Sequence, residues 1–134
     1  MGRLVDWPER LAAHIEDWRY KKFEWGKADC ALFCFNAEIA MCGQSRFEDF
    51  SGQYKTPTGS LKALIKFGKG DLDKSVSEKL QAVDISKAQR GDVALIDTDQ
   101  GDALSLVIGN KLAAMGHDGL VFLPITAAKK AWRI

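Results

Sequence analysis

A run of apolar residues, ALFCFNAEIAMC at positions 31–42, is enclosed by two strong helix signals. Asp29 precedes it as an N-cap, and Gly43 follows it as a residue that ends helices. Apolar side chains would cover most of the circumference of a helix over residues 30–42, and such a helix must be surrounded by other elements. The sequence therefore predicts a central helix against which the rest of the chain packs.

Cys30 stands on the first turn of this helix, after the tight turn that Trp25 and Gly26 predict. Unpaired backbone N–H groups and the positive end of the helix dipole both stabilise a thiolate at such a position. We therefore expect the pKa of Cys30 to be lowered, which makes this residue the candidate nucleophile; inert packing is the alternative. Cys34 and Cys42 lie within the apolar helix body and are expected to be core thiols.

The residues before the strand region predict further helices. The motif DWPE at residues 6–9 combines an N-cap, a proline in the first turn and a glutamate three residues after the cap, and it predicts a helix that ends near residue 19. A capped apolar segment predicts a helix over residues 60–68, and a more charged segment predicts a shorter one over 71–80.

Beyond residue 87 the pattern changes from helices to strands. Four short apolar segments, separated by turns that contain glycine, cover residues 93–96, 103–108, 112–115 and 120–123. Short strands joined by tight turns are typical of an antiparallel meander. A last short helix is expected over 127–132. Because 134 residues suffice for one domain with a core, we predict a single α+β domain, 1–134, with the Cys30 helix packed on the sheet.

The composition argues against several partners and cofactors. The formal charge is +1, with 19 basic and 18 acidic residues spread along the chain, and this balance does not favour nucleic acid. The apolar stretches are too short to span a bilayer, so no membrane insertion is expected. The cysteine spacings do not present tetrahedral zinc ligands, and the acids of the turns lack the spacing of a calcium loop. We expect neither a metal nor another cofactor.

Two motifs resemble the NlpC-type branch of the papain-like cysteine peptidases. The first is WGKADC at residues 25–30, in which a Trp-Gly turn leads to an Asp-Cys pair at a helix start; the second is RGDV at 90–93, which enters the sheet. The resemblance implies that Cys30 attacks an amide carbonyl and that Trp25, Gly26 and Asp29 are binding residues around it. It also implies peptide bonds of bacterial peptidoglycan as the substrate, because members of this family typically cleave them.

A closer resemblance spans nearly the whole chain, and it is to small proteins of unassigned function from tailed phages and prophages. It rests on the WGKADC turn together with the segments DWPERL at 6–11, QRGDV at 89–93, GLVFLP at 119–124 and AWR at 131–133. This resemblance implies a protein that is present in the host cytoplasm during assembly and then in the virion tail, with other phage tail proteins as its partners.

The residues that would activate the thiol depart from the NlpC pattern. That pattern has a histidine at the start of the second strand, where this sequence has Ala103, and its third polar residue falls near Met115. A papain-like reaction needs an imidazole to accept the thiol proton and to protonate the leaving amine. Of the two histidines, His14 lies beside the apolar face of the first helix, so His117, expected in a turn, is the better candidate. Asp102, a lone carboxylate, is a poor match for a thiol.

Two functions are compatible with this sequence. One is a cell-wall cysteine peptidase, with Cys30 as nucleophile, His117 as base and an oxyanion hole that includes the Cys30 backbone N–H. The other is a catalytically degenerate structural component of the tail tip or of its assembly, which uses the same fold to bind neighbouring tail proteins. The aromatic side chains of the loop over 44–58, Phe47, Phe50 and Tyr54, are candidates for the contact surface; the alternative is that they cap the core.

Overall fold

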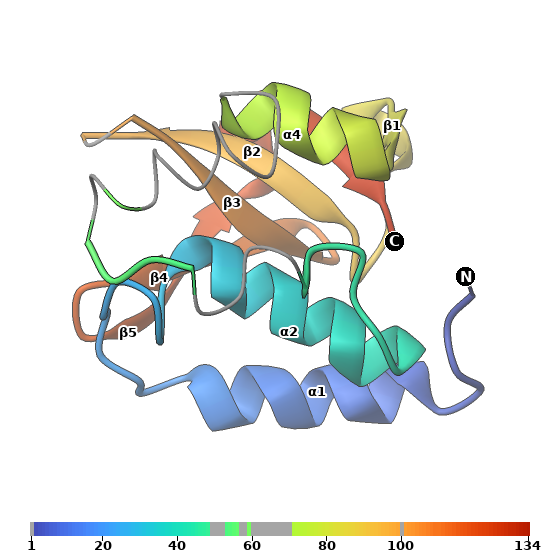
Figure 1. Cartoon of the computed structure of the whole chain (residues 1–134). Helices are drawn as coiled ribbons and strands as arrows, with labels where there is room; N and C mark the ends of the chain where they lie inside the picture. The colour runs from blue at the N-terminus through green and yellow to red at the C-terminus, as the bar shows by residue number, and fades with distance from the viewer. Residues whose placement is uncertain (1, 49–52, 57–58, 60–70, 100) are drawn as a thin grey trace.

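In the computed structural model of the chain, helices come first and an antiparallel sheet follows them (Figure 1). The structure describes residues 2–48, 53–56, 59, 71–99 and 101–134. Within these residues the α-helices are α1 (Trp7–Trp18), α2 (Cys30–Cys42) and α4 (Leu72–Lys79). The strands are β1 (Gln81–Val83), β2 (Val93–Thr98), β3 (Gly101–Ile108), β4 (Lys111–Gly116), β5 (Gly119–Pro124) and β6 (Lys130–Arg133). The predicted α+β fold class is confirmed.

The sheet has the strand order β1-β6-β2-β3-β4-β5, and every neighbouring pair is antiparallel. Strands β2 to β5 form the predicted meander. The predicted helix over 127–132 is wrong, because Ile125–Ala127 is a 3-10 turn and Lys130–Arg133 is strand β6. β6 lies between β1 and β2, where Trp132 pairs with Val93 and becomes fully buried. Pairing with the free edge of β2 thus outweighs the local helix signal.

Helix α2 lies between α1 and the sheet, as the apolar circumference of its sequence predicts (Figure 1). The Asp29 side chain accepts a hydrogen bond of 2.9 Å from the Leu32 backbone N–H, which is the N-cap contact. The helix ends at Gly43, whose φ of 86° lies in the left-handed region. Cys34 and Cys42 are buried in the main core cluster, as expected. The bounds of α2 are therefore those that the sequence predicts.

The two faces of the sheet carry different apolar clusters. Leu104 and Leu106 of β3 belong to the main core, which α2 also enters. A second, smaller cluster on alternate strand positions contains Ala94, Ile96, Val107, Leu112 and Ala114. Because neighbouring strand residues point to opposite faces, β3 contributes to both clusters. The strands are consequently anchored on both faces.

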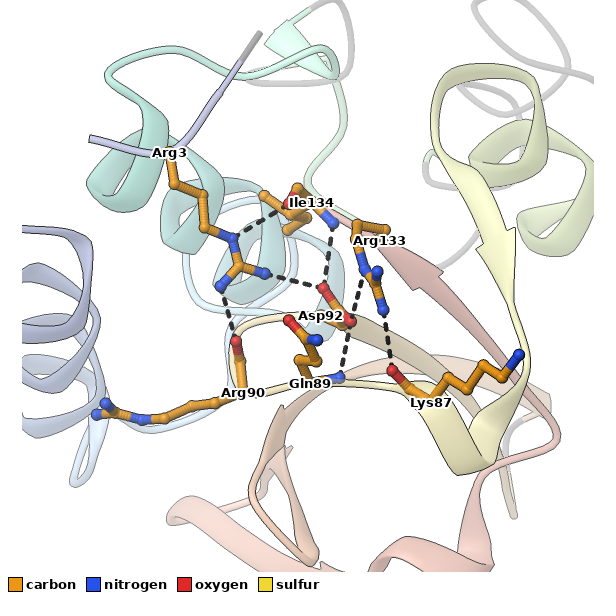
Figure 2. Close-up of polar contacts among 7 residues, drawn as sticks. All are labelled: Arg3, Lys87, Gln89, Arg90, Asp92, Arg133 and Ile134. Atoms are coloured by element: carbon orange, nitrogen blue, oxygen red, sulfur yellow. Dashed lines mark hydrogen bonds and ion pairs between the residues drawn. The ribbon is translucent and has the colours of Figure 1, made fainter. Parts of the chain in front are cut away.

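The turn that enters β2 is fixed by the buried carboxylate of Asp92 (Figure 2). Arg3 Nη2 donates to it over 2.9 Å, and the Gln89 backbone N–H donates over 2.8 Å. Further contacts come from Arg133 Nε at 3.4 Å and the Ile134 backbone N–H at 3.3 Å. Asp92 therefore joins segments that are far apart in the sequence to the start of β2.

The aromatic residues proposed as an exposed contact surface are instead part of the core where the structure describes them. Phe47 stacks on Phe35 with ring centroids 4.4 Å apart, and both Phe47 and Tyr54 are buried. The prediction of an exposed aromatic surface is therefore wrong for Phe47 and Tyr54, and the alternative, that these side chains cap the core, is confirmed for both. Phe50 and the helix predicted over 60–68 lie outside the described residues.

The charged helix predicted over 71–80 is present as α4, and the Asp71 side chain caps it through the Lys74 backbone N–H. No helix in the described part of the chain is both long and apolar enough to cross a membrane.

Candidate functional site

The chain approaches α2 through a tight turn that Asp29 holds closed. Glu24 and Ala28 form a β-bridge around it, and Gly26 has a φ of 81°. The Gly26 backbone N–H donates to Asp29 Oδ2 over 2.9 Å, so this carboxylate ties the turn to the helix start. A Cβ on Gly26 would collide with the Tyr54 backbone oxygen. The turn thus requires glycine for its conformation and for its close approach to Tyr54.

Trp25 and Tyr54 pack around this turn. The Trp25 ring meets that of Phe23 edge-on, with centroids 5.0 Å apart. Burial raises the pKa of the Tyr54 phenol, and the neighbouring Asp29 raises it further. Tyr54 is a site residue that sequence reasoning missed, since its aromatic loop gave no indication that it contacts Asp29. The turn, Asp29 and Tyr54 together set the position of the first residue of α2.

Cys30, on the first turn of α2, lines a pocket of about 250 Å³ together with residues of β2, β3, β4 and β5. Ala103 and Leu104 of β3 and Met115 of β4 line the same pocket. The structure therefore brings together the candidate nucleophile and both positions at which the NlpC pattern has its other polar residues. Those two positions carry a methyl group and a thioether, neither of which accepts a proton from a thiol.

The pocket lies where β3 and β4 separate. Their pairing runs from Ile108↔Lys111 to Leu106↔Ala113 and stops there, although the same register would bring Ser105 opposite Ala114 and then Leu104 opposite Met115. The Leu104 backbone N–H instead donates to the Cys30 sulfur. The Cys30 sulfur therefore accepts the hydrogen bond that strand β4 would accept if the pairing of β3 and β4 continued. Sequence reasoning missed Leu104, because a backbone contact that depends on where two strands separate leaves no residue-type signal.

The pKa of Cys30 is raised from its ordinary value of 9.0 to about 11, which is opposite to the expectation from the helix start. Burial is the largest cause, and the negative charge of Asp29 raises the pKa further. The backbone N–H groups of Leu104, Ala31 and Cys30 itself lower it, but by less. Cys30 is consequently a protonated thiol at neutral pH.

His117 lies in the two-residue turn between β4 and β5, where it was expected, and its side chain is exposed. Its backbone oxygen accepts a hydrogen bond of 3.0 Å from the Phe23 N–H, which ties this turn to the segment before α2. The residue is absent from the lining of the Cys30 pocket. In this conformation His117 is not placed to take the thiol proton.

His14 is enclosed between α1 and α2. Its ring stacks on Phe33 at 5.1 Å, and Nε2 lies 2.9 Å from the Phe33 backbone oxygen, to which it donates. Burial lowers the pKa of His14. Its role is therefore to pack the two helices together, and it too is absent from the pocket lining.

Asp102, the remaining acid near the base position, is held by Lys129. Lys129 Nζ lies 2.6 Å from Asp102 Oδ1 and 2.7 Å from Asp97 Oδ1. This ion pair satisfies the Asp102 carboxylate at the surface. Among the described residues, no group of three or more His, Cys, Asp or Glu side chains is arranged to hold a metal ion.

One family model matches residues 2–134, and its description is a domain of unknown function, DUF6950. The chain belongs to the DUF6950 family. No match was found among curated proteins. The DUF6950 match includes α2, the strands of the pocket and the Asp92 turn, so the candidate site lies entirely within the family domain.

Proposed function

We propose that this protein is a component of a phage tail or of its assembly, in which an NlpC-like fold serves as a binding module instead of a peptidase. The observation that carries the proposal is that Ala103 and Met115 share the Cys30 pocket at the positions where a peptidase needs an imidazole and its partner. The pocket keeps the sulfur, but neither histidine is among the residues that line it.

The chemistry of acyl transfer supports a binding function without catalysis. A cysteine peptidase attacks with a thiolate and returns a proton to the leaving amine. With a pKa of about 11, about one Cys30 in ten thousand is ionised at pH 7. His14 is hydrogen-bonded in the interface between α1 and α2, and His117 is exposed in a turn. Neither histidine is therefore placed to accept the thiol proton or to protonate the leaving amine.

The placement in the tail rests on the resemblance of the segments at 6–11, 89–93, 119–124 and 131–133 to small tail-associated proteins of phages and prophages. On this proposal the protein is present in the host cytoplasm during assembly and then in the virion tail. Its partners are neighbouring tail proteins.

A peptidase that cleaves peptidoglycan peptides through Cys30 is the second candidate. It is favoured by the three backbone N–H groups that converge on the Cys30 sulfur, since such donors also stabilise the oxyanion of an acyl-transfer intermediate. His117 would have to move toward the pocket to serve as the base.

The two candidates differ in what happens when Cys30 is replaced. We would tag the chain in a phage or prophage that encodes it, purify particles, and run peptidoglycan zymograms on the purified protein and on Cys30→Ala. The binding module predicts tail incorporation of both proteins and no clearing by either. A clearing band that Cys30→Ala loses would establish the peptidase, and absence of the wild-type protein from tails and tail intermediates would overturn the tail placement.

A further inference from the structure

Apart from the sulfur and the exposed residues Asp97, Thr98 and Asp99, the lining of the Cys30 pocket is apolar. Ile96, Ala103, Ala114, Val121 and Leu123 contribute aliphatic walls. Its volume of about 250 Å³ is smaller than the roughly 300 Å³ at which sites for small molecules begin. A cavity of this size and polarity suits one long side chain with an apolar stem.

The mouth of the pocket is acidic. Asp97 of β2 and Asp99 of the β2–β3 turn both line the pocket, and both are exposed to solvent. Lys129 is shared by Asp97 and Asp102, so two carboxylates contact one ammonium. Asp99 makes no ion pair with any residue that the structure describes. The mouth therefore keeps an excess of negative charge that an incoming cation would neutralise.

An apolar interior below an acidic mouth complements lysine and arginine, whose methylene stems pack against apolar surface while the charged end stays near water. It disfavours a carboxylate or phosphate, which Asp97 and Asp99 would repel. An uncharged aliphatic side chain would fill the interior but would leave Asp99 without a partner.

From this complementarity we infer that the Cys30 pocket receives a basic side chain, lysine or arginine, presented by a neighbouring protein of the tail. This inference rests on the proposed function, because it names the chemistry by which the binding module recognises its partner. The aliphatic stem lies against Ala103 and Ala114, and the charged end lies between Asp97 and Asp99.

The first experiment titrates the ¹⁵N-labelled protein with two capped tripeptides and follows backbone amide shifts. Acetyl-Gly-Lys-Gly-amide supplies stem and charge, and acetyl-Gly-norleucine-Gly-amide supplies the stem alone. We expect shifts at Ala103, Leu104 and Met115, with the lysine peptide binding at least threefold more tightly. Absence of shifts at these residues, or equal affinity for the two peptides, would overturn the inference.

Two variants separate the charge from the cavity. Asp99→Asn should abolish the preference for lysine over norleucine, whereas Glu16→Gln, at an exposed acid on α1, should leave it intact. Ala103→Leu fills the pocket and should abolish binding of both peptides, with the amide spectrum reporting whether the fold is retained. If Asp99→Asn still binds the lysine peptide more tightly than the norleucine peptide, Asp99 does not recognise the charge and the inference is contradicted. Because Asp99 is exposed, this substitution does not change the packing of the core.

Particle incorporation distinguishes a failure of this inference from a failure of the proposed function. If Ala103→Leu and Asp99→Asn enter tails as well as wild type does, the pocket is not the partner site, although the tail placement stands. If the wild-type protein is missing from tails and their intermediates, the proposed function fails whatever the peptides do. Loss of incorporation in both variants, with wild type present, supports the inference.

Discussion

The backbone N–H of Leu104 donates a hydrogen bond to the sulfur of Cys30, which joins the first turn of α2 to strand β3. The ladder between β3 and β4 ends at Leu106↔Ala113, so position 104 has no strand partner on that side. The thiol supplies the acceptor that β4 would have supplied in a longer β3–β4 ladder. Cys30 therefore has a structural role in the opening between these strands, whether or not it reacts.

The first prediction concerns the reactivity of that thiol. Because the pKa of Cys30 is about 11 against an ordinary 9.0, its alkylation by iodoacetamide at pH 7 should be roughly 100-fold slower than that of an unstructured cysteine peptide. The logarithm of the rate should rise linearly up to pH 10 without a plateau. Fragment-ion mass spectrometry separates Cys30 from Cys34 and Cys42. A plateau below pH 8.5 would show that the site lowers the pKa instead.

The second prediction compares two glycines of similar φ. Gly26 and Gly109 have φ values of 81° and 76°, but a Cβ collides with Tyr54 at Gly26 and has no atom within 4 Å at Gly109. Gly109→Ala should lower the free energy of unfolding by about 1 kcal/mol, the cost of a left-handed residue, and Gly26→Ala by at least twice that. Urea unfolding measures both. Equal losses would mean that the close approach to Tyr54 is not needed.

A third prediction tests the buried carboxylate of Asp92. Asp92→Asn should lower the free energy of unfolding by about 2 kcal/mol, because it removes the partner of Arg3 inside the protein; the solvent access of Arg133 limits the loss. Asp97→Asn, at an ion pair on the surface, serves as the control and should change stability little. Chemical unfolding of the two variants makes the comparison. Similar effects at both positions would contradict the anchoring role of Asp92.

The fourth prediction follows from the lowered pKa of His14. At pH values between the pKa of His14 in the folded protein and its ordinary value of 6.5, the unfolded chain binds more protons than the folded chain. The free energy of unfolding therefore falls as the pH is lowered below 6.5. Above that pH the contribution is fully present. The free energy of unfolding, measured from pH 5 to 8, should fall less steeply toward acid in His14→Phe than in wild type. Parallel curves for the two proteins would contradict this assignment.

Much of the fold was predictable because its signals are local. Asp29 and Gly43 bound α2 through contacts within one turn of the helix, and the hairpins of β2 to β5 follow from glycine-containing turns. β6 was missed because its pairing partner, the free edge of β2, comes from a segment more than thirty residues earlier. Phe47 and Tyr54 were misjudged for the same reason, since burial depends on what the fold brings over them.

The sequence by itself determined where the central helix begins and ends, that Cys30 stands on its first turn, and that Ala103 occupies the base position of the NlpC pattern. Only the tertiary structure decided the ionisation of that thiol and the surroundings of the two histidines. The helix start favours a thiolate through groups within a few residues of Cys30, but burial by α2 and the sheet disfavours the charge more strongly. Burial arises from elements distant in the chain, so it outweighs the local signal only once the chain has folded.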